Sequence, residues 1–465
     1  MEDNKFRPSI LSIFDNTLKL TWFASILVFT NFAIIVKKIN EFKLNINVNV
    51  LLITLLLLFI IIVFIYYLVI YLISRYEITH DMLTVYKNIF VKDKKEILIR
   101  NIANICISKN IFEKIFKLTR IEIFSNEKNK IFSDFEVVIS DNKYNIYIRK
   151  FLKENGYNEE KILCKSNSIK FTKVDILKHS ILSIPISSII IIINFILLIF
   201  NMIENGSLLK SIVYDILGLI ITFLGFIFPV IYSVIKNLFK NMNYYVKRNN
   251  KNIYISFGFF TKKLYIIPVS KIKGIIVDVS LLCAIFGCFK LNSIISGIGD
   301  RKNKLNMIFP ITRKKKAVEL LKLILPEYDI PLINKKQPKQ SIAVFGTKIM
   351  IIMLVLVIPA IYVNIKIAVG ISVILFILIF VIYFIKKVVI LDKYICVVNG
   401  IFLKRMQIIK YENIENIILR EGIISNKLGI CKIYMSILGT LKNSKISSGY
   451  IRKKDANVIL SKIFT

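Results

Sequence analysis

Residues 400–414 read GIFLKRMQIIKYENI, and two earlier stretches of the chain follow the same pattern. One begins at Gly258 and reads GFFTKKLYIIPVSKI, and the other begins at Asn88 and reads NIFVKDKKEILIRNI. The shared positions are the third, fifth, tenth and fifteenth, occupied by Phe90, Phe260, Phe402, Lys92, Lys262, Lys404, Ile97, Ile267, Ile409, Ile102, Ile272 and Ile414. A pattern that recurs with fixed spacing indicates that one structural unit is repeated three times.

A second landmark lies 29 residues after the start of each copy, at Lys117, Gly287 and Gly429. A bulky apolar residue precedes it each time, namely Phe116, Phe286 and Leu428. Chance matches of single Ile and Lys residues are expected in this composition. The shared spacing nevertheless favours a true repeat, with a fixed Phe that we expect to anchor each core.

The composition is that of a membrane protein with a basic surface. Of the 465 residues 55% are apolar, above the share of about 45–50% in soluble proteins. The net charge is +36, from 66 Lys and Arg against 30 Asp and Glu. Such an excess suits an anionic partner. A bias of the genome toward Ile, Lys and Asn codons is the competing explanation for the total.

Six apolar segments have lengths close to the roughly 20 residues that a helix needs to cross a bilayer. They form three pairs, at residues 18–36 and 48–73, 176–200 and 208–235, and 348–363 and 367–385. A cleaved signal is the alternative for the first segment, although Lys37 and Lys38 do not resemble a cleavage site. A single long helix is the alternative for the last pair, although Pro359 and the total length favour two passes.

The positive residues beside the membrane ends predict the orientation, because Lys and Arg are retained on the cytoplasmic side. They gather at the termini and long loops, at Arg75, Lys170, Lys173, Lys178, Lys236, Lys240, Lys247, Arg248, Lys386 and Lys387. The second and third turns contain only Lys210 and Lys366, whereas the first turn contains Lys37, Lys38 and Lys43 and disagrees. We expect both termini to be cytoplasmic.

The predicted organisation is therefore hairpin then module, three times over. The hairpins occupy residues 1–73 (with the N-terminal segment), 176–235 and 348–385, and the modules occupy 74–175, 236–347 and 386–465. Short β-branched or aromatic stretches bounded by turn residues predict strands at 251–257, 264–269 and 394–398. Gly258 and Gly400 fall where a strand pair would turn, and Asn88 would turn there in the first copy.

Each module closes with an amphipathic helix. In the first, Tyr144, Ile148 and Phe151 share one face, with Asp141 as the expected N-cap and Gly156 as the stop. In the other two modules the apolar face comprises Ala317, Leu320, Leu321 and Ile324, and Ala456, Ile459, Leu460 and Ile463. The expected fold class is an α+β membrane protein in which three transmembrane hairpins each precede a β-barrel or sandwich with a C-terminal helix.

Such a module resembles the bacterial pleckstrin-homology domain of type 2. The resemblance rests on the opening Tyr76-Glu-Ile-Thr, on its diverged counterpart from Tyr245, on the Gly-Ile/Phe-Phe turn and on the later Phe286-Gly287 or Leu428-Gly429. With Arg7-Pro8 before the first helix, the whole chain looks like the YdbT family of bacterial membrane proteins. The resemblance implies a bacterial cell-envelope role, in stress or antimicrobial resistance, and a smaller membrane partner with one such module. Lys117 and Pro268 depart from the shared pattern.

No enzyme chemistry, cofactor site or metal site can be assembled from the sequence. The two histidines, His80 and His179, lie far apart, and the six cysteines form no CxxC pair. No phosphate-binding glycine loop or HExxH occurs. We therefore predict a non-catalytic scaffold or binding protein. A transporter or flippase that uses the hairpin bundle is the alternative.

The second module is the most basic, with 22 Lys and Arg against 5 Asp and Glu over residues 236–348. The candidate contact with anionic lipid or an acidic partner comprises Arg301, Lys302, Lys304, Arg313, Lys314, Lys315 and Lys316. A merely solvated face is the competing interpretation. The expected partners are anionic membrane lipids and either a second membrane protein with a PH-like module or another copy of the chain; nucleic acid is not expected.

Overall fold

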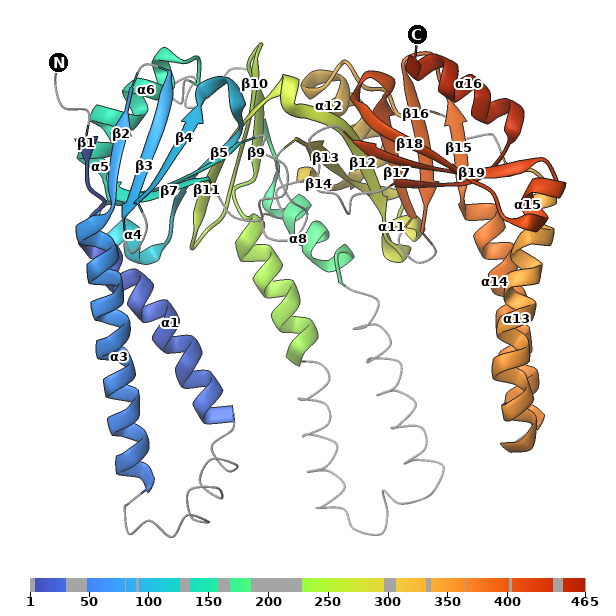
Figure 1. Ribbon diagram of the computed structural model, residues 1–465, viewed down its shortest axis with the longest axis horizontal. Coiled ribbons are helices and arrows are strands. Elements are labelled where there is room, and N and C mark those ends of the chain that lie inside the picture. The colour runs from blue at the N-terminus through green and yellow to red at the C-terminus, as the bar shows by residue number, and fades with distance from the viewer. Residues whose placement is uncertain are drawn as a thin grey trace. The chain divides into compact units, whose positions relative to one another are not determined.

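The computed structural model shows an α+β chain (Figure 1). It describes residues 5–30, 48–79, 81–88, 92–125, 134–157, 168–184, 228–296, 307–331, 336–363, 365–400, 404–437 and 446–464. These belong to two compact units. The N-terminal unit comprises Met1–Ser125, Phe132–Lys165 and Phe260–Ile266, and the C-terminal unit comprises Asn126–Ile131, Ser166–Phe259 and Ile267–Thr465.

The N-terminal unit contains two groups of antiparallel strands. The first has the order β1-β2-β3-β4, formed by Lys5–Phe6, Arg75–Ile78, Met82–Asn88 and Lys92–Leu98. The second has the order β7-β6-β5-β11, formed by Phe135–Ser140, Leu118–Ser125, Ile102–Lys109 and Lys262–Pro268. Two helices, α1 (Leu11–Thr30) and α3 (Val48–Ile73), extend from this unit (Figure 1).

The C-terminal unit contains most of the other two repeats. Strand β9 (Tyr245–Arg248) lies between β8 (Ser168–Lys170) and β10 (Asn252–Phe257). A six-stranded sheet has the order β14-β13-β12-β17-β16-β15, formed by Met307–Arg313, Cys288–Ile295, Ile272–Val279, Lys404–Lys410, Tyr394–Asn399 and Lys387–Ile390. A three-stranded sheet has the order β18-β19-β20, formed by Ile414–Arg420, Ile430–Ile437 and Ile446–Arg452.

The repeated sequence motif forms the same local structure in all three copies. Strands β4, β11 and β17 each begin at the fifth-position lysine, namely Lys92, Lys262 and Lys404. A single 3-10 turn follows, and strands β5, β12 and β18 each begin at the fifteenth-position isoleucine. Each of these three strands has an irregularity of register two residues long, at Ile102/Asn104, Ile272/Gly274 and Ile414/Asn416. The three repeats therefore share the same local structure, including a β-bulge at the equivalent position.

The landmark glycines adopt backbone conformations that other residues avoid. Gly258 and Gly400 have φ of 110° and 104°, which confirms the predicted turns. Gly287 and Gly429 have φ of 61° and 67°, and Lys117 adopts the same left-handed conformation with φ of 51°. Lys117 therefore keeps the backbone geometry of the repeat although its side chain makes that geometry less favourable. Asn88 ends β3, next to residues outside the described part of the chain.

The expectation that the third-position phenylalanines anchor the core is wrong where it can be examined. Phe260 is 46% exposed, and Phe90 and Phe402 lie outside the described residues. The buried positions are instead the tenth-position isoleucines Ile97, Ile267 and Ile409, none more than 3% exposed. The phenylalanine precedes the strand, at the turn, whereas the isoleucine faces inward from the strand itself.

A helix closes each repeat, as predicted. In the first copy it comprises α5 (Asp141–Lys143), a π-helical segment (Tyr144–Arg149) and α6 (Lys150–Glu154). Ser140, not Asp141, occupies the N-cap position, because the Asp141 carboxylate accepts hydrogen bonds from Thr119 and Lys109 instead. The other closing helices are α12 (Lys314–Ile324) and α16 (Lys453–Phe464). The predicted face of α12 is buried.

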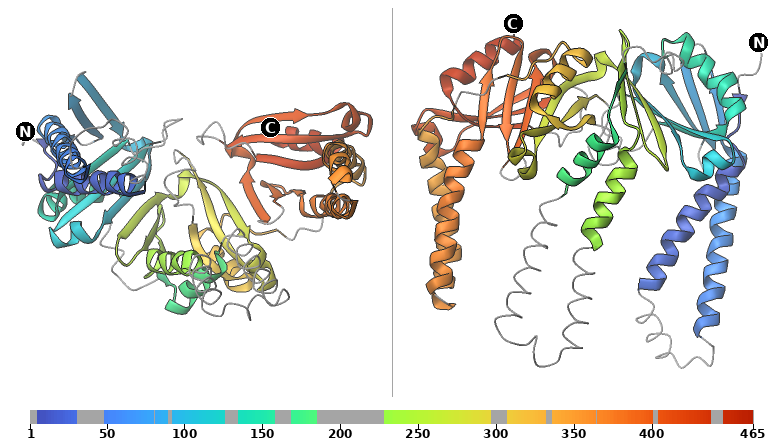
Figure 2. Two further views of the ribbon diagram at one scale, coloured as in Figure 1. Left: turned by 90° about the horizontal axis from the view of Figure 1, so that it is seen from below. Right: turned by 180° about the vertical axis from the view of Figure 1, so that it is seen from behind.

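One helix in the described residues has a stretch, Ile53–Ile73, that is long and apolar enough to cross a membrane. It is part of α3, whose bounds are those predicted. Helices α13 (Gln340–Val363) and α14 (Ile365–Ile385) pack against each other as a hairpin, so the alternative of one long helix is wrong (Figure 2). Most of the predicted second hairpin, including residues 185–227, lies outside the described residues.

Candidate functional site

The structure describes four of the seven predicted basic residues. Arg301, Lys302 and Lys304 lie outside the described residues, whereas Arg313 ends β14 and Lys314, Lys315 and Lys316 form the first turn of α12. All four are exposed. The Lys316 ammonium lies 3.5 Å from the Asp175 carboxylate, near the start of α8 (Lys173–Leu182). Positive charge at the start of a helix opposes the helix dipole and costs stability, so this arrangement favours a role other than folding.

Two lysines of the third repeat extend this basic surface. Burial and the ammonium groups of Lys387 and Lys314 together lower the pKa of Lys404, so these three side chains repel one another electrostatically. The sequence analysis did not include Lys387 and Lys404 in the site. Pairing of β12 with β17 brings the third repeat beside the second, and no pattern within one repeat reveals that pairing. A crowded set of ammonium groups produces a positive potential that attracts anions.

Strand register places this surface at the end of the sheet from which a hairpin extends. Lys387, two residues after the end of α14, pairs with Val398 of β16. Val398 pairs with Met406 of β17, which pairs in turn with Val277 near the end of β12. The C-terminal ends of α14 and β12 therefore lie at the same end of this sheet, measured along the strand direction.

Three short helices, one in each repeat, expose large apolar side chains. They are α4 (Ile111–Ile115), α11 (Leu281–Ile285) and α15 (Ile423–Lys427), each directly after β5, β12 or β18. The exposed residues are Ile111, Ile115, Phe116, Leu281, Ile285, Phe286, Ile423 and Ile424. Ile285 is 69% exposed and Ile423 is 83% exposed. We call these three helices, together with Phe116, Phe286 and Leu428 directly after them, the apolar tips. Apolar side chains exposed at one place in three repeats indicate an interaction surface.

Each apolar tip contacts a helix that leads into an apolar hairpin. Beside α4, the Asn110 side-chain amide lies 3.4 Å from the Asp15 carboxylate of α1. Beside α11, the Ser280 hydroxyl donates a hydrogen bond of 3.2 Å to the carbonyl of Leu182 at the end of α8. Beside α15, Leu428 packs against the cluster that contains Phe345 of α13. Within its own unit, each tip therefore lies beside a helix that belongs to a predicted hairpin or directly precedes one.

Two cationic side chains act electrostatically on a residue next to the α11 tip. The charges of Arg313 and Lys178 act on the thiol of Cys288, directly after Gly287, although burial dominates and raises the pKa of that thiol. Apolar side chains that enter the acyl boundary, with basic side chains at headgroup level, are the combination used by proteins that lie on anionic membranes. The α11 tip, with Arg313 and Lys178 acting nearby, has this combination of side chains.

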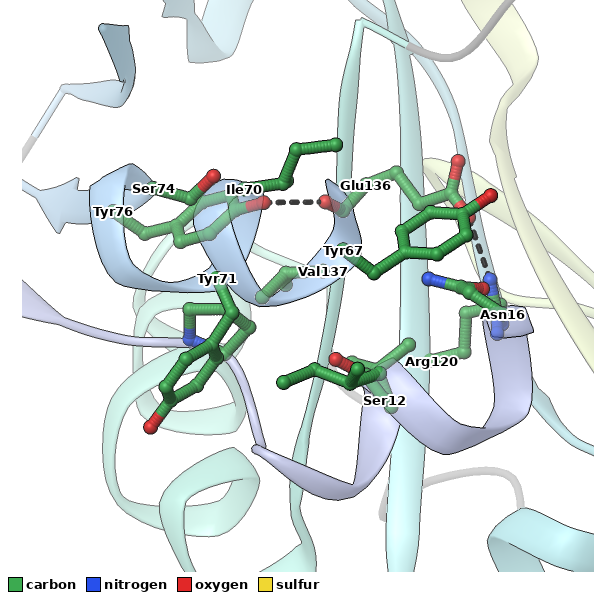
Figure 3. Close-up of a pocket in the computed structure, with 13 residues that line it drawn as sticks. Ser12, Asn16, Tyr67, Ile70, Tyr71, Ser74, Tyr76, Arg120, Glu136 and Val137 are labelled. Atoms are coloured by element: carbon green, nitrogen blue, oxygen red, sulfur yellow. Dashed lines mark hydrogen bonds and ion pairs between the residues drawn. The ribbon is translucent and has the colours of Figure 1, made fainter. Parts of the chain in front are cut away.

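A separate pocket in the N-terminal unit has a volume of about 300 Å³ and lies between α1, α3 and strands β6 and β7 (Figure 3). Its polar side is formed by Arg120, which contacts the carboxylates of Asp15 and Glu113 at 2.7 Å and of Glu136 at 2.6 Å. Burial opposes the charge of Arg120, but the three carboxylates outweigh it and raise its pKa. This network fastens α1 to the module. In the described residues, no group of three His, Cys, Asp or Glu side chains is placed to hold a metal.

Comparison with known proteins agrees with this architecture. The family model described as "Bacterial PH domain" matches residues 24–154, 181–340 and 341–464. The chain is 23% identical over 311 residues to "UPF0699 transmembrane protein YdbT" of Bacillus subtilis (strain 168), which covers 61% of this chain and 62% of that protein. No solved structure matches the chain. With three matches that together span most of its length, the chain belongs to the bacterial PH domain family.

Proposed function

We propose that the protein is a non-catalytic, multi-pass scaffold that holds three PH-like modules against the anionic cytoplasmic leaflet of the bacterial cell membrane. The single observation that supports this most is the exposure of apolar side chains at the same place in all three repeats. The hairpins anchor the chain, the apolar tips enter the headgroup boundary, and the lysines around α12 and β17 bind lipid phosphate. Each such lysine contributes about 1 kcal/mol near an anionic surface. The role suggested by the family resemblance is in the cell envelope.

The depth of the α11 tip can be measured with tryptophan fluorescence in the full chain. The only Trp, Trp22, is replaced with Phe, and Ile285→Trp or Leu323→Trp is added. Both positions are similarly exposed, at 69% and 67%, but Leu323 lies at the far end of α12. In liposomes that contain brominated lipids, we expect strong quenching at position 285 and weak quenching at position 323. Equal quenching at the two positions would refute the proposed orientation of the tips.

The charge of the surface is tested in the same liposomes. Replacing Arg313, Lys314, Lys315 and Lys316 with Gln is expected to reduce quenching at position 285 when the lipids are anionic and the salt concentration is low. The same replacement should have no effect in zwitterionic lipid, because its headgroups have no net negative charge to attract the lysines. If the four replacements change the quenching at position 285 equally in anionic and zwitterionic lipid, these residues are merely solvated and do not bind anionic lipid.

The topology of the hairpins makes a separate prediction. Cysteines introduced at Glu204 and Asn364, in the second and third turns, are expected to react with a membrane-impermeant maleimide on intact cells. A cysteine at Lys302, in the second module, is expected to react only after the cells are opened. Labelling of position 302 in intact cells contradicts the cytoplasmic placement of the modules, and protection of both turns contradicts the number of passes.

A further inference from the structure

Successive repeats are joined by one type of strand pairing. In the N-terminal unit, β5 of the first repeat pairs antiparallel with β11 of the second, from Ile105 opposite Ile266 to Lys109 opposite Lys262. In the C-terminal unit, β12 pairs antiparallel with β17 of the third repeat, up to Val279 opposite Lys404. Both junctions have the same register, since each places the last strand residue opposite the fifth-position lysine of the next repeat.

The third repeat also contains the strand that forms such a junction, namely β18. Strand β18 is equivalent to β5 and β12, and it forms one edge of its sheet in the described part of the chain. Strand β4, equivalent to β11 and β17, likewise forms an edge of its sheet there. The chain therefore contains one edge strand equivalent to each of the two strands that form a junction: β18 is equivalent to β5 and β12, and β4 is equivalent to β11 and β17.

Residues of β18 are more exposed than the equivalent residues of β5 and β12, which are covered by a strand of the next repeat. Ile107 of β5 is 8% exposed and Val277 of β12 is 2% exposed, but the equivalent Leu419 of β18 is 37% exposed. Ile418, next to it, is 41% exposed, whereas the equivalent Cys106 of β5 is 1% exposed. An exposed apolar edge strand is a template for pairing with another strand.

The register of the two existing junctions can be transferred to β18 and β4. It places Ile418 opposite Lys95, Leu419 opposite Lys94, Arg420 opposite Asp93 and Glu421 opposite Lys92. The last two pairs each bring opposite charges together, which stabilises neighbouring strands.

The charge at one position discriminates between possible partner strands. In the junction of β12 with β17, Asp278 accepts a hydrogen bond of 2.8 Å from Arg405. In β18 the residue equivalent to Asp278 is Arg420, so the acid is replaced by a base. The residue equivalent to Arg405 is Lys263 in β11 but Asp93 in β4. Strand β4 alone of the three has the acid that Arg420 requires.

We propose that β18 pairs antiparallel with β4 of a second copy of this chain, in the register of the two internal junctions. Both surfaces belong to the same chain, so the contact is head-to-tail, and it continues from copy to copy unless it closes into a ring. This association goes beyond membrane binding and does not require it.

Disulfide trapping in membranes tests the contact and its register. Two differently tagged full-length chains are expressed together, one with Lys95→Cys and the other with Ile418→Cys. We expect oxidation to yield a product that contains both tags, because directly opposite residues of antiparallel strands lie within disulfide range. The register control is Leu419→Cys with Lys95→Cys, which should yield severalfold less. Equal yields from both pairs, or the absence of a product that contains both tags, would overturn the proposal.

Charge exchange provides the second test and its own control for folding. In the trapping assay, Arg420→Asp alone and Asp93→Arg alone are each expected to lower the yield severalfold. Combining Asp93→Arg in the Lys95→Cys chain with Arg420→Asp in the Ile418→Cys chain should restore it, because the pair is then reversed but complementary. A combination no better than either single change contradicts pairing between these strands.

Discussion

Replacing Arg120 with Ala is expected to lower the free energy of unfolding of the N-terminal unit by about 3–5 kcal/mol, the usual cost of removing one partner of a buried ionic network. The Asp15 and Glu113 side chains, 8% and 1% exposed, would remain as buried carboxylates without their cation. Glu136 contributes less, because its side chain is 47% exposed to solvent. The loss should therefore arise mainly from the junction between α1, α4 and β6.

Hydrogen exchange on the full chain in detergent measures this loss locally. We expect faster exchange in β6 and at the base of α1, with little change in the sheet of β18, β19 and β20. Lys5→Ala is the matched control, since the Lys5 ammonium lies 4.0 Å from Glu77 and is half-exposed. If Arg120→Ala and Lys5→Ala have equal effects, the network does not hold α1 to the module.

Replacing Ile267 with Ala is expected to destabilise the chain by about 2–5 kcal/mol, because the deletion leaves a cavity at a position that is 1% exposed. The matched change Phe260→Ala, seven residues earlier in the same motif, removes a larger side chain that is 46% exposed. It should therefore cost much less. Unfolding of the two purified variants in denaturant, followed by circular dichroism, gives the comparison. A larger loss of stability from Phe260→Ala than from Ile267→Ala would show that the phenylalanine, not the isoleucine, is the core residue.

These two positions show which part of the fold the motif predicts. The pattern identified the strands at 251–257 and 264–269, the strand at 394–398 and the turns at Gly258 and Gly400, because period and turn chemistry are local properties. It did not identify which apolar residue faces inward. Phe260 and Ile267 are both apolar and both recur, and only the position of the strand start at Lys262 separates the turn from the core.

The candidate surface was predictable only where it is continuous in sequence. Arg313–Lys316 were recognised as a basic run at a helix start, and the structure places them there. Lys387 and Lys404 join them through pairing of two repeats, which a sequence pattern within one repeat does not reveal. The apolar tips were missed for a different reason. Phe286 and Leu428 were recognised as the bulky residues before the landmark positions, but an apolar residue is ordinarily taken as a sign of burial.

The junction of β5 with β11 has a consequence for biosynthesis. Strand β5 ends at Lys109 and its neighbour begins at Lys262, so the ribosome must add the intervening residues before the edge of the first module can be covered. Those residues include the whole predicted second hairpin. Completion of the first module during translation therefore waits for that hairpin to leave the ribosome. A nascent chain arrested before Lys262 should expose the β5 edge to chaperones and proteases, which links quality control to membrane insertion.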